Sequence, residues 1–418
     1  MIVRKIRENE LLEAHRISAL SFHWSLDDKG KSPEEFAKEA RANPQDKLVS
    51  VDTDIWASFT DGEEMMSAMG VLPYKIAFDG HQVAMAGIGA VCTYPQHRRK
   101  GAVKGMFLHA LNDMYDRKIP FSYLYPFSEQ FYGNFGYHRS CASILWDFDL
   151  KTIPDYKWQG SFTLHKPGEA LDDFKTAYQA FAPHWNMMVY RDDFDWSRVK
   201  DADPFKGEGH AFLYKDEKGK PAGYLVFEKR TGEKDRRILS CREVAFDSFT
   251  TLKALMAFLK TFAADYEGAS MQMPFSLNLG FFCADYPQSG TTRKVAMNGM
   301  ARAVHVEEVL RLAKYQGSGS LDLYVHDDFL QKNNGLYHIA FEDGKAKEVA
   351  FTPLPCAALG QTGKKADVEI SVQIFSAAIL GNYDVADFEY LDGVALYCDS
   401  EKASRVFYKK PNWINNYF

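Results

Sequence analysis

The sequence predicts an α/β (α+β) fold with mixed, largely antiparallel sheets, divided over two or three domains. Three observations lead to this prediction. The 418 residues are too many for one ordinary hydrophobic core. Short apolar runs alternate with Asp-Gly pairs, which are typical of tight hairpin turns. Segments with helical apolar spacing follow several of these runs, so helices alternate with strands.

The first predicted elements are a helix and an antiparallel meander. Residues 32–42, SPEEFAKEARA, begin with a Ser cap, a Pro in the first turn and early acidic residues, which mark a helix start. Residues 54–91 contain short apolar runs broken at Asp61-Gly62 and Asp79-Gly80. Both dipeptides favour tight turns, so we expect these strands to pair with their neighbours along the chain.

A helix over residues 101–117 and a strand over residues 120–127 complete the first predicted unit. The strand has the sequence PFSYLYPF. The helix is expected to lay one face on the sheet, because its apolar residues recur at helical spacing: Val103, Phe107, Leu111 and Met114.

A second unit repeats this pattern weakly. Residues 236–246, RRILSCREVAF, resemble a strand, and an amphipathic helix follows it. The two are joined by DSFTT, which contains neither a cation nor a glycine. If the unit is a duplicated copy of the first, it has lost the basic turn described below. The apolar positions of the helix are Leu252, Leu255, Met256, Leu259 and Phe262.

A third unit begins near residue 293. Residues 302–314 are expected to form a helix, and residues 317–320 a loop between that helix and the next strand. Asn334-Gly335 and Asp343-Gly344 are predicted to be hairpin turns.

Composition excludes several classes of protein. With 50 basic and 56 acidic residues the formal charge is −6, so we expect no nucleic-acid partner and no attraction to an acidic membrane. The N-terminus has no signal-peptide core and no apolar stretch reaches membrane-spanning length, which predicts a cytoplasmic protein. The six cysteines are scattered without metal-ligand spacing, so we expect buried thiols and no metal.

The basic turn in YPQHRRKGAVKGMFLHAL, residues 94–111, carries the strongest chemical signal. A strand that enters a helix through a turn of cations and glycine points backbone N–H groups at one place, and the helix dipole adds to their effect. Such a place binds phosphate. The P-loop pattern is absent, and GIGAV at 87–91 is too short for a dinucleotide fingerprint. A solvated basic loop is the alternative interpretation.

These residues resemble a known superfamily. Arg98-Arg99-Lys100-Gly101-Ala102-Val103 is similar to the R/Q-x-x-G-x-G/A signature of the GCN5-related N-acetyltransferases (GNAT), whose turn holds the pyrophosphate of acetyl-CoA. AGIGAVCTYPQHRRKG followed by FYGNFGYH (131–138) resembles the enhanced intracellular survival (Eis) branch. In that branch the place of Val103 is commonly aliphatic.

The resemblance extends over the whole chain. VYRDDFDW (189–196) matches the branch's spaced Arg and Trp, here Arg191 and Trp196, and RAVHVEEVL resembles the start of its last domain. It implies two tandem GNAT-type folds followed by a sterol carrier protein (SCP2)-like α+β domain. The implied ranges are a catalytic domain at 1–150, a degenerate domain without cofactor site at 151–292, and an SCP2-like domain at 293–418 that ends in the active-site carboxylate.

The resemblance also implies roles for single residues. Tyr132 is the expected general acid toward the CoA thiolate, and the C-terminal carboxylate of Phe418 the expected base or amine-orienting group. Core packing of Tyr132 and a frayed tail at Phe418 are the alternatives. The strand at Val91, Cys92 and Thr93 is expected to pair with the pantetheine arm. The expected pyrophosphate ligands are Arg98, Arg99, Lys100, Gly101, Ala102, Val103 and Lys104.

The acceptor side is expected at LSFHWSLDD (20–28), where Phe22 and Trp24 would pack and Asp27 and Asp28 would pair with ammonium groups. A solvated acidic loop is equally open for both Asp residues. The implied enzyme acetylates primary amines of multi-amine small molecules of the aminoglycoside, polyamine or lysine type, and assembles as a homo-oligomer, with hexamers known in the branch.

A second hypothesis makes the protein a binding module. Its SCP2-like domain would carry a lipid or another apolar ligand, and the GNAT fold would remain as an inactive scaffold. Only analogy of fold supports this hypothesis.

Overall fold

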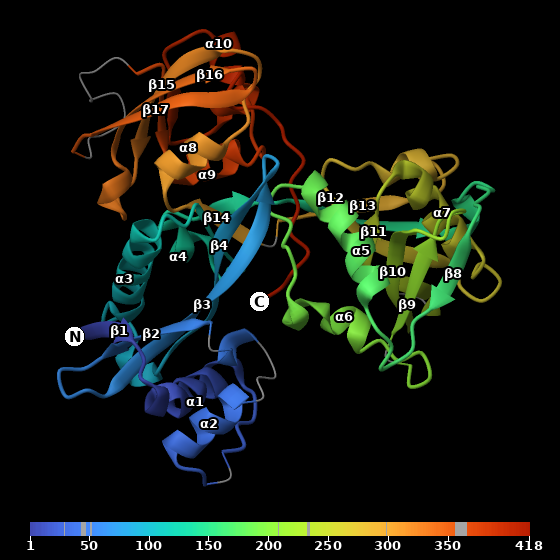
Figure 1. Ribbon diagram of the computed structural model, residues 1–418, viewed down its shortest axis with the longest axis horizontal. Helices are drawn as coiled ribbons and strands as arrows, with labels where there is room; N and C mark the ends of the chain where they lie inside the picture. Colours follow the sequence, from blue (N-terminus) through green and yellow to red (C-terminus); the bar gives the residue numbers. More distant parts are fainter. Residues whose placement is uncertain are drawn as a thin grey trace. The chain divides into compact units, whose positions relative to one another are not determined.

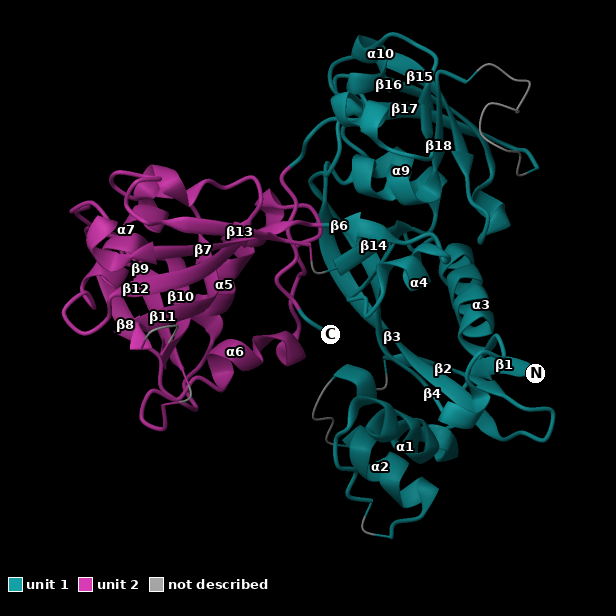
Figure 2. Ribbon diagram, turned by 180° about the vertical axis from the view of Figure 1, so that it is seen from behind, with its two compact units in different colours: residues 1–140, 299–410, 417–418 teal, residues 141–298, 411–416 magenta. Residues whose placement is uncertain are grey.

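The computed structural model describes residues 1–28, 30–42, 47–50, 52–207, 209–231, 235–297, 299–355 and 366–418. The chain forms two compact units, coloured separately in Figure 2. One contains residues 1–140, 299–410 and 417–418, and the other contains residues 141–298 and 411–416. Two mixed sheets with helices and a third, smaller sheet confirm the predicted α/β class.

The first sheet has the order β1-β2-β3-β4-β5-β14-β6 (Figure 1). Its pairs are antiparallel except for the parallel pair β4 and β5. The strands are β1 (Ile2–Lys5), β2 (Asp54–Phe59), β3 (Met65–Phe78), β4 (His81–Thr93), β5 (Phe121–Leu124), β6 (His138–Ser140) and β14 (Gly299–Ala303). Its helices are α1 (Leu11–Phe22), α2 (Pro33–Ala42), α3 (Ala102–Asp116) and α4 (Glu129–Gly133).

Alternation along the strands gives this sheet two buried faces. Side chains of a strand point in turn to opposite sides. On β2, Trp56 belongs to the core that contains α3, whereas Ile55 and Ala57 belong to the core that contains α1. The two helices therefore cover opposite faces of the sheet, and both faces exclude water.

The second unit repeats this arrangement. Its sheet has the order β13-β7-β12-β11-β10-β9-β8, again with one parallel pair, β11 and β12. The strands are β7 (Ser143–Asp149), β8 (Ser161–Leu164), β9 (His210–Lys215), β10 (Pro221–Thr231), β11 (Arg237–Phe246), β12 (Gly268–Pro274) and β13 (Thr292–Ala296). Its helices are α5 (Asp172–Phe181), α6 (Ser197–Lys200) and α7 (Phe249–Lys260).

A segment near the end of the chain also belongs to the second unit. The Asn186 N–H donates to the carbonyl of Pro411 at 2.9 Å, and the Trp413 N–H donates to the carbonyl of Asn186 at 2.9 Å. The Trp413 indole is 1% exposed and lies against Phe181 and Trp185. Residues 411–416 thus complete this unit's core.

The third sheet, in the first unit, has the order β17-β16-β15-β18-β19. A buried ion pair ties it to the first sheet: Arg302 on β14 meets Asp327 at 2.5 Å, and both side chains are fully buried. Its strands are β15 (Gly319–His326), β16 (Gly335–Glu342), β17 (Lys345–Pro353), β18 (Val368–Ser371) and β19 (Val394–Leu396). Its helices are α8 (Val306–Leu312), α9 (Val372–Ile379) and α10 (Ser400–Ser404).

Three details differ from the sequence predictions. The structure departs from the predicted domain ranges 1–150, 151–292 and 293–418 at two strands. β7 pairs in the second sheet, and β14 pairs in the first. The helix expected over 302–314 is shorter, because residues 302 and 303 belong to β14. The prediction of a hairpin turn at Asn334-Gly335 is wrong. Within a longer loop, the Asn334 side chain instead forms hydrogen bonds with the backbone N–H and the carbonyl oxygen of Asp327.

Among the described cysteines, Cys92, Cys141, Cys241 and Cys283 are buried and Cys398 is half-buried, whereas Cys356 lies outside the described residues. No helix in the described part of the chain is both long and apolar enough to cross a membrane.

Candidate active site

The basic turn forms a cradle at the start of α3. A short 3-10 helix, Pro95–His97, leads into it, and Arg99 and Gly101 have left-handed backbones with φ of 63° and 79°. The first N–H groups of a helix have no acceptor within it, and here the first helical bond runs from Gly105 to Gly101. The cations around this helix end are all exposed: Arg98, Arg99, Lys100 and Lys104.

The corresponding helix of the second unit begins differently. At α7 the Ser248 hydroxyl accepts a hydrogen bond from the Thr251 N–H, so a side chain of the protein caps the helix. The N-cap of α3 is Gly101, which has no side chain to do this. The two turns therefore differ in both charge and capping: α7 has one N–H fewer to offer an external anion, and it lacks the cations that surround the start of α3.

A bulge in β4 opens the edge of that strand next to the cradle. The register with β3 shifts between Ala68 and Gly70, so two residues of β4, Ala90 and Val91, lie opposite one residue of β3. Ala90 has a φ of 50°. The pairing with β5 ends at Ile88, before the bulge. Val91, Cys92 and Thr93 therefore lie beyond the last residue of β4 that pairs with β5.

Tyr132 lies on α4 within a cluster of aromatic rings. Its side chain is 4% exposed, and its ring packs edge-on against Phe107, Phe127 and Phe131. Burial raises the pKa of the Tyr132 phenol to about 12. The hydroxyl is therefore a proton donor throughout the physiological range. The neighbouring Tyr137 is fully buried, and its hydroxyl lies 2.7 Å from the Ser122 hydroxyl in the core.

Phe418 occupies a notch in the first sheet. Its ring lies 4.7 Å from the Tyr74 ring and 5.4 Å from the Tyr125 ring, centre to centre. A Cβ on Gly87 would lie 2.7 Å from a carbon of the Phe418 ring, so only glycine leaves space for this ring. The C atom of Phe418 lies 3.7 Å from where a Cβ on Gly89 would stand. The end of the chain thus lies against β4, just before the bulge.

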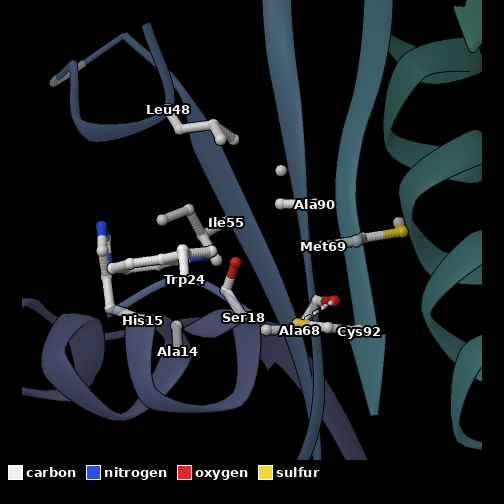
Figure 3. Close-up of a pocket in the computed structure, with 11 residues that line it drawn as sticks. Ala14, His15, Ser18, Trp24, Leu48, Ile55, Ala68, Met69, Ala90 and Cys92 are labelled. Atoms are coloured by element: carbon white, nitrogen blue, oxygen red, sulfur yellow. Dashed lines mark hydrogen bonds between the residues drawn. The ribbon is translucent and has the colours of Figure 1, made fainter. Parts of the chain in front are cut away.

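A cavity of about 350 Å³ lies on the α1 side of the same bulge (Figure 3). It is bounded by α1, by the loop after α1 and by β2, β3 and β4. Gly70 and Ala90 belong to its wall, so it borders the strand segment that approaches Phe418. Its lining residues are Ala14, His15, Ser18, Trp24, Leu48, Ile55, Ala68, Met69, Gly70, Ala90 and Cys92.

The four predicted acceptor residues lie in different surroundings. Trp24 lines the cavity and is 41% exposed, whereas Phe22 is an exposed residue at the end of α1. Asp28 accepts a hydrogen bond from Arg16 at 2.9 Å, which lowers the pKa of its carboxyl group. Asp27 is exposed and is not among the lining residues. Trp24 is thus the member of this set that the structure brings to the cavity.

Sequence reasoning missed the contribution of α1. Ala14, His15 and Ser18 form one side of the cavity, and Ser18 lies four residues after Ala14 and three after His15, the spacings of neighbours on a helix surface. Apolar periodicity over residues 11–22 marks Leu11, Ala14 and Ile17, which are buried, and gives no signal for His15 and Ser18. Ala90 has no such signal either, because its inward position follows from the bulge. Among the described residues, no group of three or more His, Cys, Asp or Glu side chains is arranged to hold a metal ion.

Comparison with protein families matches three segments of the chain to known domains. Residues 2–140 match an acetyltransferase (GNAT) domain, and residues 187–306 match another acetyltransferase (GNAT) domain. Residues 306–415 match a sterol carrier protein domain.

Whole-length relatives agree with this assignment. An uncharacterized N-acetyltransferase of Streptomyces avermitilis is 22% identical over 79% of this chain and 83% of its own length. Another uncharacterized N-acetyltransferase, of Streptomyces coelicolor, is 24% identical over 80% of this chain and 81% of its own length.

Solved structures share the fold over the whole chain. A probable N-acyltransferase from Enterococcus faecalis superposes with a TM-score of 0.80 at 20% identity, covering 100% of this chain and 99% of its own. Eis1 from Mycobacterium abscessus superposes with a TM-score of 0.79 at 15% identity, covering 100% of both. The chain is therefore an acyltransferase of the GNAT superfamily, with two GNAT domains and a sterol carrier protein domain.

Proposed function

We propose that this acyltransferase moves the acetyl group of acetyl-CoA to a primary amine at the bulge of β4. One observation carries the proposal: the bulged segment, residues 89–93, has the basic cradle of α3 directly after it and borders the cavity on the α1 side. A thioester on one side of the segment and an amine on the other would meet there. Acetyl-CoA is the acyl donor used by the GNAT superfamily, and it supplies the activated acetyl group.

The chain's own residues fit a coenzyme A ligand. A pyrophosphate needs N–H donors and cations without competing carboxylates, and the cradle offers the start of α3 with four exposed cations. The proposed ligands are Arg98, Arg99, Lys100, Gly101, Ala102, Val103 and Lys104. The amide groups of the pantetheine arm would bond the backbone of Val91, Cys92 and Thr93.

Tyr132 is proposed to donate a hydrogen bond to the departing sulfur. With a pKa of about 12, complete proton transfer to a thiolate of ordinary pKa near 8.5 is uphill by about 5 kcal/mol. The tyrosine therefore acts as a hydrogen-bond donor that stabilises the developing negative charge on sulfur. Such a donor remains protonated over the whole working range of pH. As the amine nitrogen bonds to the acetyl carbon, the C–S bond breaks; the amine loses a proton to solvent, and the released thiolate takes one up from solvent.

In a chain that ends at Phe418, the terminal carboxylate is proposed to hold the amine. A carboxylate of pKa near 3.5 cannot by itself deprotonate an alkylammonium of pKa near 10. It can accept hydrogen bonds from the amine and balance its charge until a proton is lost. The notch at Gly87 and the approach of Phe418 to Gly89 support this role.

The finer assignment to the Eis branch is also a proposal. It is supported by the sequence resemblance. The superposition with Eis1 shows a shared fold and nothing more specific. The resemblance predicts multi-amine acceptors and a homo-oligomer, with hexamers known in the branch; for the acceptor, the lining of the cavity leads to a different inference below. The hypothesis of a lipid carrier gains no support from the described residues beyond the sterol carrier fold of the last domain.

Binding of acetyl-CoA tests the cradle. Arg98→Gln removes a charged donor, so the Kd of acetyl-CoA, measured by calorimetry, should rise about tenfold. Arg117→Gln is the matched control, because Arg117 follows the opposite end of α3 and contacts Asp113 and Asp54 there. Equal affinities of both variants and the wild type would remove the cradle from coenzyme binding.

A further inference from the structure

We infer that the acceptor carries a single primary amine on a compact apolar body, such as an arylalkylamine, and is not a polycation. This inference rests on the proposed function, since it concerns the cavity in which the amine would bind. The argument uses the chemistry of the lining, the partners of nearby carboxylates and the cost of removing ammonium groups from water.

The walls of the cavity are mostly apolar. Aliphatic and indole groups make up most of the lining, and its volume of about 350 Å³ is near the small end for ligand cavities. In Figure 3 Trp24, Ile55 and Leu48 frame one side, and Ala90 and Met69 lie on the strands opposite. A flat or branched apolar body of one or two rings fits such a lining.

Apart from the Trp24 indole, the polar side chains that line the cavity are those of His15, Ser18 and Cys92. The Nδ1 of His15 lies 2.9 Å from the carbonyl oxygen of Leu11, so this nitrogen carries the proton and donates it. The Cys92 thiol donates to the carbonyl of Ala68 at 3.4 Å. Burial raises the pKa of this thiol to about 12, so it stays neutral. The hydroxyl of Ser18 projects from α1 toward the space between Trp24 and Ala90 (Figure 3).

Two carboxylates near the cavity, those of Glu13 and Asp28, have partners that do not line it. Glu13 accepts a hydrogen bond from the Tyr94 hydroxyl at 2.6 Å and lies 3.4 Å from Arg16. Asp28 binds the same Arg16. None of the lining residues in the described part of the chain is Asp or Glu. The described lining therefore supplies no carboxylate for a second or third ammonium group.

Desolvation then selects the acceptor. An unpaired ammonium group in an apolar cavity loses its hydration without compensation, whereas a neutral amine loses little. The carboxylate of a chain that ends at Phe418 can balance one positive charge at the rim beside Gly89. One amine is thus oriented and favoured in its reactive neutral form, and the additional ammonium groups of a polyamine are penalised.

Steady-state kinetics with two probes test this inference. The full chain is given acetyl-CoA with either phenethylamine or spermidine, and release of the coenzyme A thiol is followed. We expect kcat/KM for phenethylamine to exceed that for spermidine at least tenfold. Faster turnover of spermidine would overturn the inference and leave the proposed acetyl transfer intact. If neither amine reacts, a wider panel of primary amines tests the proposed function, and equilibrium dialysis decides the inference: tighter binding of spermidine than of phenethylamine would overturn it.

A charge placed in the wall gives a second test. Ser18→Asp adds a carboxylate to the lining, so kcat/KM should fall about tenfold for phenethylamine and rise about tenfold for spermidine. Leu20→Asp is the matched control, because Leu20 is exposed on the same helix and does not line the cavity. Equal changes in both variants, or no change in the ratio of the two substrates, would show that the lining does not set the preference.

Discussion

Gly87→Ala probes the notch that holds Phe418 with a single added methyl group. The new Cβ would lie 2.7 and 2.9 Å from two carbons of the Phe418 ring and 2.8 Å from a carbon of Tyr74. Carbon atoms prefer separations of about 3.5–4.0 Å. Because the added Cβ is too close to both rings, both must shift by about 1 Å, and the Phe418 ring is the one at the end of the chain.

The size of the effect follows from this displacement. A shift of about 1 Å in a positioning group can lower a rate about 100-fold. If the carboxylate of a chain ending at Phe418 holds the amine, kcat/KM for the amine should fall by a factor of about 10 to 100. The cradle for coenzyme A lies after the bulge, so the KM for acetyl-CoA should stay within about twofold of the wild-type value.

The assay is thiol release with one substrate varied at a time. Gly62→Ala is the control, because a Cβ there meets only the Thr60 hydroxyl oxygen at an ordinary 3.7 Å. In a Phe418→Ala background the notch is empty of the ring, so Gly87→Ala should have little further effect. Unchanged kcat/KM in Gly87→Ala, or a full additional loss in the double variant, would refute the reasoning.

Two further predictions concern Tyr132 in the first unit and Arg191 in the second. Tyr132→Phe should lower kcat about 100-fold while the Kd of acetyl-CoA is unchanged, because the lost hydrogen bond forms to the leaving sulfur. A pKa raised to about 12 keeps the phenol protonated, so wild-type kcat should show no loss from this group between pH ~8 and ~10.5; a tyrosine-dependent decline there contradicts the assignment. Arg191→Met should destabilise the second unit by about 3–5 kcal/mol in denaturant unfolding, since it leaves the buried Glu243 carboxylate without the guanidinium that it meets at 2.5 Å. Arg230→Met, which breaks a half-exposed pair with Glu228, should cost about 1 kcal/mol or less, and equal losses in both variants would contradict this account.

Elements specified by local chemistry could be predicted from the sequence. The helix at Pro33–Ala42 starts where its cap and acidic first turn indicate, and Ser32 accepts from the Glu35 N–H. The turns at Asp61-Gly62 and Asp343-Gly344 join paired strands as expected. The helix of the basic turn begins at Ala102, one residue after the glycine. Each of these signals acts within a few residues.

Features that depend on distant pairing could not be predicted in this way. β14 enters the first sheet between β5 and β6 from a position far along the chain, and its own residues carry no mark of that partner. The place of residues 411–416 in the second unit depends on Asn186 in the same way. The sequence of an apolar strand segment does not indicate which strand it pairs with, so the pairing is seen only in the folded sheet.

Parts of the candidate site could likewise be predicted from the sequence, and other parts could not. The basic turn and Tyr132 carry motifs, so the resemblance could indicate them. The cavity depends on the bulge at Ala90 and on the face of α1 that carries Ser18. The engagement of Asp28 by Arg16 is a side-chain contact that the acidic character of the loop did not reveal.

Amine-dependent release of the coenzyme A thiol tests the central claim most directly. The full chain is mixed with acetyl-CoA and a panel of primary amines, and both the thiol and the acetylated amine are measured. The account predicts equal amounts of thiol and amide with at least one amine, and no thiol above background without one. Retained acetyl-CoA binding without amine-dependent release across the panel would contradict it.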